Sequence, residues 1–268
     1  MIRVGVFGAA GRMGSTVCQA VLGDAELELV AAVDPLHAGL DLRHAARVES
    51  DLHVTANASA LVDARAEVVV DFTHLDAARE NLRFAAEHGI HAVVGTTGFT
   101  DEDLATYGAA FTRSSCLIVP NFAIGAVLMM RFAELAAPWF ETAEIIELHH
   151  DNKVDAPSGT AMATAERMAA ASGDWAPDPT STDTLEHARG AVGPAGIPIH
   201  AVRMRGMVAH QEVLLGTTGQ TLSIRHDTYD RASFMPGVLL AVKNVAKRPG
   251  LTLGLDPILF SSTEDRDS

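Results

Sequence analysis

The 268-residue sequence is poor in cysteine, in aromatic residues and in positive charge. Its two cysteines, Cys18 and Cys116, lie in apolar stretches, which argues against a disulfide framework and favours a reducing compartment. The 20 Lys and Arg residues are outnumbered by 34 Asp and Glu residues, giving a formal net charge of −14, and no basic stripe is concentrated anywhere. A nucleic-acid partner is therefore not expected, whereas a small anionic substrate needs only local positive potential.

Long apolar runs are also missing. No segment approaches the roughly 20 apolar residues that a membrane-spanning helix needs. The N-terminus, Met1–Gly8, passes directly into a strand-like run without the features of an export signal. We therefore expect a soluble, cytoplasmic protein without a membrane partner. The hydrophobic content of 48% is sufficient for one large core or two moderate ones.

The first 119 residues alternate β-branched runs with helix-like segments, which is typical of a parallel sheet covered by helices. Some strands are apolar nearly throughout, as in Val68–Val70, and this is expected when both faces of the sheet are buried. The predicted strands are Ile2–Phe7, Leu27–Val33, Glu67–Phe72, His91–Val94 and Leu117–Val119. The predicted helices are Gly11–Leu22, Leu75–Glu87 and Leu104–Phe111.

After Asn121 the pattern changes. Three strand-like segments near the end follow one another without a helix between them, which predicts an antiparallel or mixed sheet in a domain of its own. Predicted strands here are Ala143–His149, Ile197–Met204, Gln211–Gly216 and Gln220–His226. Predicted helices are Ile124–Ala136, Ser158–Ala171 and Arg231–Lys247, and Ser261–Ser268 reads as a polar, disordered tail.

The connection Ser172–Gly196 is rich in Gly, Pro, Ser, Thr and Asp and is unusually long for a compact domain. It is interpreted either as a lid or oligomer contact or as a tolerated surface insertion, and the sequence does not decide between them.

A glycine-rich loop, Gly8-Ala9-Ala10-Gly11-Arg12-Met13-Gly14, follows the first strand and opens a helix. Backbone N–H groups at such a helix start can bind the pyrophosphate of a dinucleotide. The spacing is G-x-x-G-x-x-G rather than G-x-G-x-x-G, so the loop alone is equivocal. Asp34 at the end of the second strand lies where a ribose-binding carboxylate is expected, although Asp34-Pro35 could also be a simple turn.

Two further loops lie at strand ends, Gly95–Gly98 and Val119–Phe122. Ligands of open α/β sheets bind outside the carboxyl ends of the strands, so both loops are placed to line the nicotinamide half of a cofactor. Either loop could equally be an ordinary turn between a strand and the next element.

The most informative stretch is Glu147-Leu148-His149-His150-Asp151-Asn152-Lys153-Val154-Asp155-Ala156-Pro157-Ser158-Gly159-Thr160. It runs from a strand end through a loop with two imidazoles and an ammonium into a helix start. Lys153 and the backbone N–H groups near Ser158, Gly159 and Thr160 form an anion site that suits a carboxylate, so a dicarboxylic substrate fits.

Adjacent histidines on a strand point to opposite faces, so His149 and His150 are poorly placed to chelate one ion. The sequence has no Cys/His/Asp grouping with zinc-like spacing and no G-x-S-x-G nucleophile motif. We therefore expect no metal site.

The run Glu147–Thr160 resembles the E-x-H-H-x-x-K-x-D-A-P-S-G-T signature of the 4-hydroxy-tetrahydrodipicolinate reductases, also called dihydrodipicolinate reductases. The loops Gly8–Gly14 and Gly95–Gly98, the pair Asn121-Phe122 and the segment Arg231–Gly237 are similar to that family in the same order. The resemblance covers nearly the whole chain, and Ser172–Gly196 is its least matched part.

The resemblance implies a Rossmann-like dinucleotide-binding domain, residues 1–122 and 231–268, and an α+β domain with a mixed sheet, residues 123–230, that binds substrate, closes over it and forms a homotetramer. It implies that His149 is the general acid/base and Lys153 a proton donor. Residues implied to contact the substrate carboxylates are His150, Lys153, Gly159 and Thr160. Residues implied to line the cofactor are Gly8, Ala9, Ala10, Gly11, Arg12, Met13, Asp34, Gly95, Thr96, Thr97, Val119, Pro120, Asn121 and Phe122.

The expected activity is therefore reduction of 4-hydroxy-tetrahydrodipicolinate by NADH or NADPH in the diaminopimelate route to lysine. One alternative is another two-domain nicotinamide oxidoreductase acting on a small acid or aldehyde, which would not explain His-His-x-x-Lys before a Ser-Gly-Thr helix start. A second, non-enzymatic alternative is a dinucleotide-sensing module. Asp34 favours NADH while Arg12 could offset repulsion of a 2′-phosphate, so we expect use of both cofactors.

Overall fold

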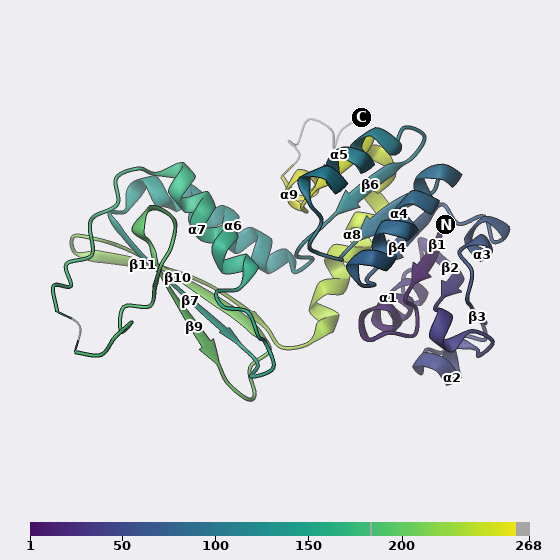
Figure 1. The fold of residues 1–268 in the computed structure, drawn as a ribbon, viewed down its shortest axis with the longest axis horizontal. Coiled ribbons are helices and arrows are strands. Elements are labelled where there is room, and N and C mark those ends of the chain that lie inside the picture. The colour runs from purple at the N-terminus through teal and green to yellow at the C-terminus, as the bar shows by residue number, and fades with distance from the viewer. Residues whose placement is uncertain (183, 261–268) are drawn as a thin grey trace. The chain divides into compact units, whose positions relative to one another are not determined.

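The computed structural model describes residues 1–182 and 184–260, so the tail expected at residues 261–268 lies outside the described part. The chain divides into two compact units, and Figure 1 colours it by residue number from purple at the N-terminus to yellow near the C-terminus. One unit contains Met1–Phe122 and the chain from Phe234 onward, and the other contains Ala123–Ser233. The chain thus leaves the first unit once and returns to it.

The first unit is built on a seven-stranded sheet with the order β12-β6-β5-β4-β1-β2-β3. Every pairing in it is parallel. The chain starts in the middle of the sheet at β1 and builds outward in both directions, so the strand order reverses between β1 and β4, where dinucleotide-binding sheets hold their ligand. The strands are β1 (Ile2–Phe7), β2 (Leu27–Val33), β3 (Val54–Thr55), β4 (Val68–Asp71), β5 (His91–Val94), β6 (Ser115–Ile118) and β12 (Gly250–Leu253).

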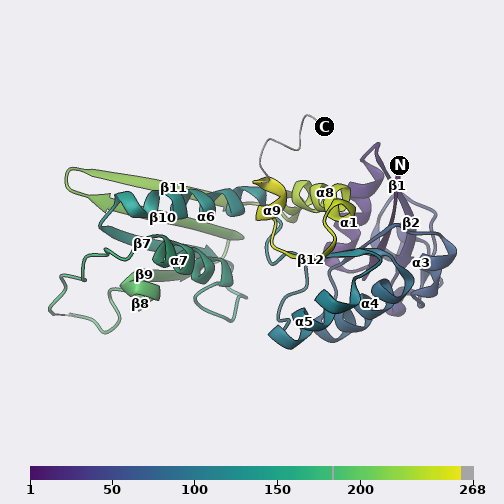
Figure 2. The same cartoon turned by 90° about the horizontal axis from the view of Figure 1, so that it is seen from above.

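Helices cover both faces of this sheet, as Figure 2 shows, with α1 and α8 on one side and α4 and α5 on the other. Side chains on both faces of the strands are therefore buried. Phe7, Val69 and Val94 belong to the core under α3, α4 and α5. Their sequence neighbours Val6, Val70 and Val93, which point to the other face, are also fully buried. These helices are α1 (Arg12–Leu22), α3 (Ser59–Asp63), α4 (Leu75–His88), α5 (Asp101–Ala110) and α8 (Met235–Asn244).

Short elements that the sequence did not reveal complete this unit. They are α2 (Leu42–Ala46), α3, β3, β12 and α9 (Asp256–Leu259), with the 3₁₀ turn η1 (Pro35–His37) after β2. The helix expected over Arg231–Lys247 is divided into η4 (Arg231–Phe234), α8 and η5 (Val245–Lys247). Pro236 lies in the first turn of α8, where a missing N–H costs nothing.

The second unit has a five-stranded mixed sheet with the order β11-β10-β7-β9-β8, in which β7 and β9 are parallel and the other pairs antiparallel. The strands are β7 (Thr142–His149), β8 (Ala191–Val192), β9 (Pro198–Arg203), β10 (Ala209–Thr217) and β11 (Gln220–Thr228). The register sets Glu147 beside Gln211 on one side and Ala201 on the other, and His149 beside Arg203.

Two helices, α6 (Ile124–Ala136) and α7 (Gly159–Ala171), pack on one face of this sheet. The turn η2 (Ala137–Trp139) follows α6, and the core between helices and sheet contains Ala133, Ala165, Ile145 and Val213. Because side chains alternate along a strand, Glu147 and His149 point to the same face as Ile145, toward the start of α7.

The segment expected to be a structureless loop, Ser172–Gly196, is partly regular. Its end forms the edge strand β8 and the turn η3 (Pro194–Gly196), and Trp175 packs against the helix–sheet core. The fold class predicted from the sequence, a Rossmann-like unit plus an α+β unit with a mixed sheet, is confirmed. Within residues 1–182 and 184–260, no helix is long and apolar enough to cross a membrane.

Candidate active site

The glycine loop after β1 has the shape that a pyrophosphate site requires. Gly8 has a left-handed φ of +64°, and a side chain at Gly14 would come within 2.0 Å of the Gly8 carbonyl oxygen. Gly11 is the N-cap of α1 and offers no side chain to the first turn. The predicted loop residues Ala9 and Ala10 lie between these glycines, and Arg12 and Met13 form the start of α1. This bare helix start fits an anionic group.

Asp34 is held in place at the end of β2 and is 7% exposed. Its carboxylate accepts hydrogen bonds from the backbone N–H of Ala10 at 3.2 Å and of Leu36 at 3.1 Å, and the ring of His37 lies 3.1 Å away. The two predicted cofactor residues Ala10 and Asp34 are therefore brought into contact. The alternative turn role of Asp34 is also real, because the same carboxylate caps η1.

A third strand end, at β4, contributes a residue that the sequence analysis missed. Asp71 is 1% exposed and accepts hydrogen bonds from the backbone and hydroxyl of Thr73, from Asn81 and from Thr96. The Thr96 hydroxyl also donates to the Thr73 carbonyl at 2.9 Å. Asp71 thus links the loop after β4 to the predicted loop after β5. The sequence analysis did not single it out because it lies inside the apolar run Val68–Asp71, where no motif marks it.

The remaining predicted cofactor positions lie at the ends of β5 and β6. Gly95 packs so closely that a side chain would meet the Phe72 ring at 2.0 Å, and that ring lies 5.4 Å from the Phe122 ring, centre to centre. Val119 and Phe122 are buried, Asn121 is half-buried, and Thr97 and Pro120 are exposed.

In the second unit, the end of β7 carries an ion pair between buried Glu147 and half-buried Arg203. The Glu147 side chain is fully buried, and both of its oxygens accept from the Arg203 guanidinium, at 2.8 and 2.9 Å. The same carboxylate accepts from the His149 ring nitrogen Nδ1 at 2.5 Å and from the Ser158 backbone N–H at 3.1 Å. One side chain therefore connects the predicted acid/base His149 to the predicted anion-binding helix start.

The electrostatics of this cluster favour an ionised Glu147 and a neutral His149. Burial would raise the pKa of Glu147, but the hydrogen bonds from Arg203 and His149 outweigh it and hold that pKa below its usual value. Burial lowers the pKa of His149, and Lys153 and Arg203 add to this, while Glu147 acts in the opposite direction. The hydrogen bonds to Glu147 raise the pKa of Arg203.

Lys153 lies in the loop that connects β7 to α7, and its ammonium is 2.8 Å from both oxygens of Asp155. Arg203 also donates to the Asp155 backbone carbonyl at 2.6 Å, which ties this loop to β9. His150, the second histidine of the motif, is exposed. The two histidines thus differ in surroundings, since His149 is the last residue of β7 and His150 follows the strand.

The helix α7 begins where the sequence predicted an anion site. Ser158 is its N-cap, and the hydroxyl accepts from the Ala161 backbone N–H at 3.2 Å. Gly159 is exposed, and Thr160 is half-buried in the first turn. Arg203, which binds both Glu147 and the Asp155 carbonyl, was not singled out from the sequence because it lies about 50 residues further on, in another strand.

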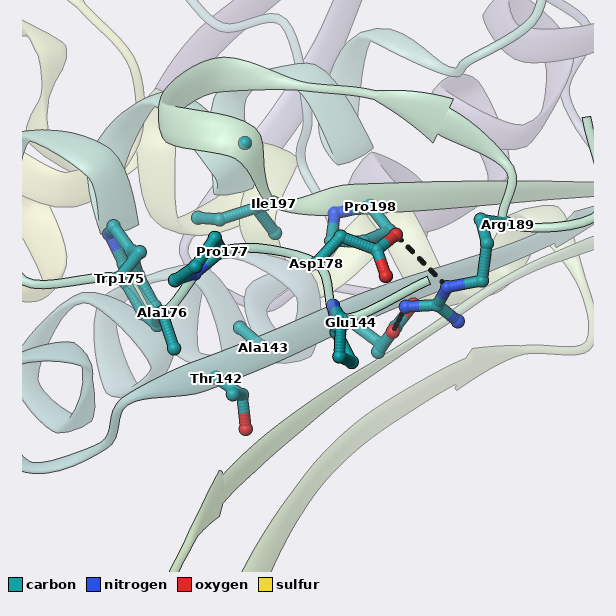
Figure 3. A pocket seen from close by; sticks show the side chains of 12 residues that line it. Thr142, Ala143, Glu144, Trp175, Ala176, Pro177, Asp178, Arg189, Ile197 and Pro198 are labelled. Carbon is teal, nitrogen blue, oxygen red and sulfur yellow. Dashed lines mark hydrogen bonds and ion pairs between the residues drawn. The ribbon is translucent and has the colours of Figure 1, made fainter. Parts of the chain in front are cut away.

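The described residues contain no group of three or more His, Cys, Asp or Glu side chains that could hold a metal ion. A small pocket of about 60 Å³ lies elsewhere on the second unit, where the segment after α7 passes β7 (Figure 3). At this pocket the Arg189 guanidinium forms ion pairs with Asp178 and Glu144. The ring of His200 lies 2.6 Å from the same Glu144 carboxylate. Neither His149 nor Lys153 lines this pocket.

A parallel sheet with a bare glycine-rich helix start, and a second sheet with a histidine and a lysine beside a helix start, are features expected of a two-domain nicotinamide-dependent oxidoreductase. Two family models match the chain, "Dihydrodipicolinate reductase, N-terminus" over residues 2–122 and "Dihydrodipicolinate reductase, C-terminus" over residues 125–259. The chain belongs to the dihydrodipicolinate reductase family.

Relatives and solved structures agree with this assignment. The chain is 53% identical over 262 residues to the 4-hydroxy-tetrahydrodipicolinate reductase of Mycobacterium sp. (strain KMS), covering 96% of this chain and 99% of that one. It is 52% identical over 265 residues to the enzyme of the same name from Nocardia farcinica, covering 96% and 98%. The dipicolinate-bound dihydrodipicolinate reductase from Paenisporosarcina sp. TG-14 superposes with a TM-score of 0.85 at 41% identity, covering 96% and 99%.

More distant structures share the fold alone. An amine dehydrogenase from Mycobacterium smegmatis matches with a TM-score of 0.65 at 16% identity, covering 94% of each chain. The predicted family and the predicted class of enzyme, an NAD(P)H-dependent reductase, are therefore confirmed, and the alternative of a dinucleotide-sensing module is not supported.

Proposed function

We propose that this reductase converts 4-hydroxy-tetrahydrodipicolinate to tetrahydrodipicolinate in the diaminopimelate route to lysine, with His149 as general acid/base and Lys153 as substrate anchor and proton donor. The observation that carries the assignment is that the Glu147 carboxylate accepts four hydrogen bonds. Through them it joins His149 to the helix start at Ser158. The name of the bound compound in the Paenisporosarcina structure, a pyridine dicarboxylate, supports a dicarboxylate substrate.

Binding of the substrate is assigned to positive groups of the second unit. Lys153 and the helix start at Ser158, Gly159 and Thr160 suit two carboxylates, and His150 adds a polar contact. Because Lys153 is bonded to Asp155 in the structure, a substrate carboxylate would replace or share that partner.

NAD(P)H bound to the first unit supplies the hydride. Its binding is assigned to the loop Gly8–Met13, Asp34, the loop Gly95–Thr97 and the segment Val119–Phe122. In the net reaction a hydride enters the ring, the 4-hydroxyl leaves as water and one proton is consumed. His149 and Lys153 are the groups placed to hold and deliver that proton.

The test is a coupled assay that follows NADH oxidation, with substrate supplied by the preceding synthase reaction. His149→Gln keeps a polar side chain but cannot titrate, so kcat should fall by roughly 10² to 10⁴, the usual scale for general acid catalysis. Lys153→Ala should lower kcat and raise KM, because it removes both a proton donor and an anchor.

His150→Gln is the matched control, because it changes the adjacent but exposed histidine. Near-normal turnover in His149→Gln with intact NADH binding would eliminate His149 as the acid/base. A large loss of kcat in His150→Gln would assign that role to the second histidine.

Dipicolinate itself offers a second test, because it is a planar mimic of the substrate. It should inhibit competitively, and Thr160→Val should weaken the inhibition by disturbing the first turn of α7. Inhibition that is unchanged in Thr160→Val would place the carboxylate site elsewhere.

We further assign a cytoplasmic location and a homotetramer that assembles through the second sheet. The helices pack on the face that carries Ile145, while the opposite face carries the half-buried side chains Ile146, Leu148 and Leu214. Half-buried apolar side chains on an open sheet face are typical of subunit contacts. Sedimentation should report four subunits, and Ile146→Arg should lower that number.

A further inference from the structure

Glu147 accepts more hydrogen bonds than its ion pair with Arg203 alone would supply. A carboxylate has about four acceptor positions, and in Glu147 all four are used: two by Arg203, one by His149 and one by the Ser158 backbone N–H. The side chain is fully buried, so water does not substitute for any of these donors.

This arrangement dictates which nitrogen of His149 carries the proton. An ionised carboxylate only accepts hydrogen bonds, so the Nδ1 atom that faces Glu147 must be protonated. A neutral His149 then has its lone pair on Nε2, the atom turned away from Glu147. The pKa of Glu147 is held below its usual value despite burial, chiefly by the hydrogen bonds from Arg203, so the carboxylate stays ionised at neutral pH.

We propose that Glu147 is a positioning residue: ionised by Arg203, it fixes the tautomer and ring orientation of His149 so that Nε2 faces the substrate. The proposal rests on the proposed role of His149 and extends it to two residues that do not touch the substrate. A histidine whose second nitrogen bonds a buried carboxylate is a recurrent device for keeping an acid/base group in one protonation pattern.

The charged groups around His149 come from three places. Glu147 lies on its own strand, Arg203 on the neighbouring strand β9, and Lys153 in the loop that follows. Glu147 raises the pKa of His149, whereas Lys153 and Arg203 lower it. Removing the Glu147 charge therefore shifts the His149 titration to lower pH.

The chain contains a matched control three residues earlier on the same strand. Glu144 also pairs with an arginine, Arg189 (Figure 3), and with a histidine, His200, at 2.6 Å. It lies an odd number of residues from Glu147, so it points to the opposite face of the strand. Glu144→Gln thus removes the same kind of charge from the same kind of cluster, away from His149.

The experiment compares Glu147→Gln, Glu144→Gln and wild type in kcat, KM, NADH affinity, pH–rate profile and ¹⁵N NMR of the histidine ring. An amide cannot accept all four bonds, so in Glu147→Gln the Nδ1–H tautomer of His149 should lose its predominance. We expect kcat to fall at least about tenfold, as for other orienting carboxylates. NADH affinity should stay within about twofold, and the pH–rate limb that reports His149 should move to lower pH. Glu144→Gln should match wild type in turnover and in the His149 tautomer.

Glu147→Gln leaves the half-buried Arg203 short of a counter-charge, which could unfold the protein. The double variant Glu147→Gln/Arg203→Gln removes both charges, and it should fold and show the same tautomer change and loss of kcat. An unchanged tautomer overturns the proposal, whether or not turnover falls. A change confined to KM overturns it as well, because it would mean that Glu147 serves only the helix start at Ser158. Wild-type turnover in His149→Gln would instead refute the proposed function itself.

Discussion

Single carboxylates organise both candidate binding regions. Asp34 and Asp71 in the first unit and Glu147 in the second are nearly or fully buried, and each accepts bonds from two or more segments. A buried charge is tolerated only when its acceptor positions are filled, so these residues fix the loops around them.

Asp34 should set the cofactor preference. Wild type should use both NADH and NADPH, with a preference for NADPH of less than about a hundredfold, roughly 2.7 kcal/mol. Asp34→Asn keeps a hydrogen-bonding group but removes repulsion of the 2′-phosphate. The ratio of kcat/KM for NADPH over NADH should therefore rise by about tenfold, or roughly 1.4 kcal/mol.

Asp41→Asn is the control for this variant. Asp41 also bonds a histidine three residues on, His44, and also caps a short helix. It should leave the cofactor ratio unchanged. An unaltered ratio in Asp34→Asn would show that the carboxylate does not face the ribose.

At the scale of elements, the start of α7 combines a structural role with a proposed binding role. Ser158 caps the helix, and we assign the same turn to the substrate carboxylates. Ser158→Ala should lower the free energy of unfolding by about 1 kcal/mol through loss of the cap. It should also raise the KM for substrate, because the first turn of the helix loses its fixed geometry. Chemical denaturation and steady-state kinetics measure the two effects.

Thr100→Ala provides the matched comparison. Thr100 caps α5 with the same hydroxyl-to-backbone bond, to Asp103 at 3.2 Å, within a capping box in the first unit. It should lower stability by a similar amount, about 1 kcal/mol, and leave substrate KM unchanged. Equal KM values in the two variants would contradict a binding role for the α7 start.

At the scale of the whole molecule, we expect three histidines to make stability depend on pH. Burial is the main cause that lowers the pKa of His91, His149 and His226. The unfolded chain titrates near the reference value of about 6.5, so in the range just below it the unfolded state binds more protons than the folded state. The contribution of these histidines to the free energy of unfolding is therefore complete above about pH 6.5. It falls as the pH drops through their pKa values in the folded state.

Thermal unfolding should show this directly, with a lower midpoint at pH 5.5 than at pH 8. His91→Gln removes one of the three groups and should flatten the dependence between these two values. His91 accepts a hydrogen bond from the Ser115 backbone N–H at 3.0 Å, so the variant is compared with wild type at each pH separately. A midpoint that stays constant or rises on acidification would refute the linkage.

Long periodic elements were predictable from the sequence because their own residues determine them. The strands Ile2–Phe7, Leu27–Val33 and His91–Val94 and the helix Ile124–Ala136 have the predicted bounds. Gly250–Leu253 was not predicted, and its parallel pairing with Ser115–Ile118 makes it a strand. The same holds for Ala191–Val192, which pairs with Pro198–Ile199 at the sheet edge.

By itself the sequence determined the α/β class through local periodicity, and its resemblance to a known family gave the family and pointed to His149 and Lys153. Only the tertiary structure decided that Arg203 stands beside His149 and that Glu147 binds both, together with Ser158. The reason is physical. Pairing of β7 with β9 brings together residues more than 50 positions apart, and no periodicity along the chain encodes which buried carboxylate will receive which donors.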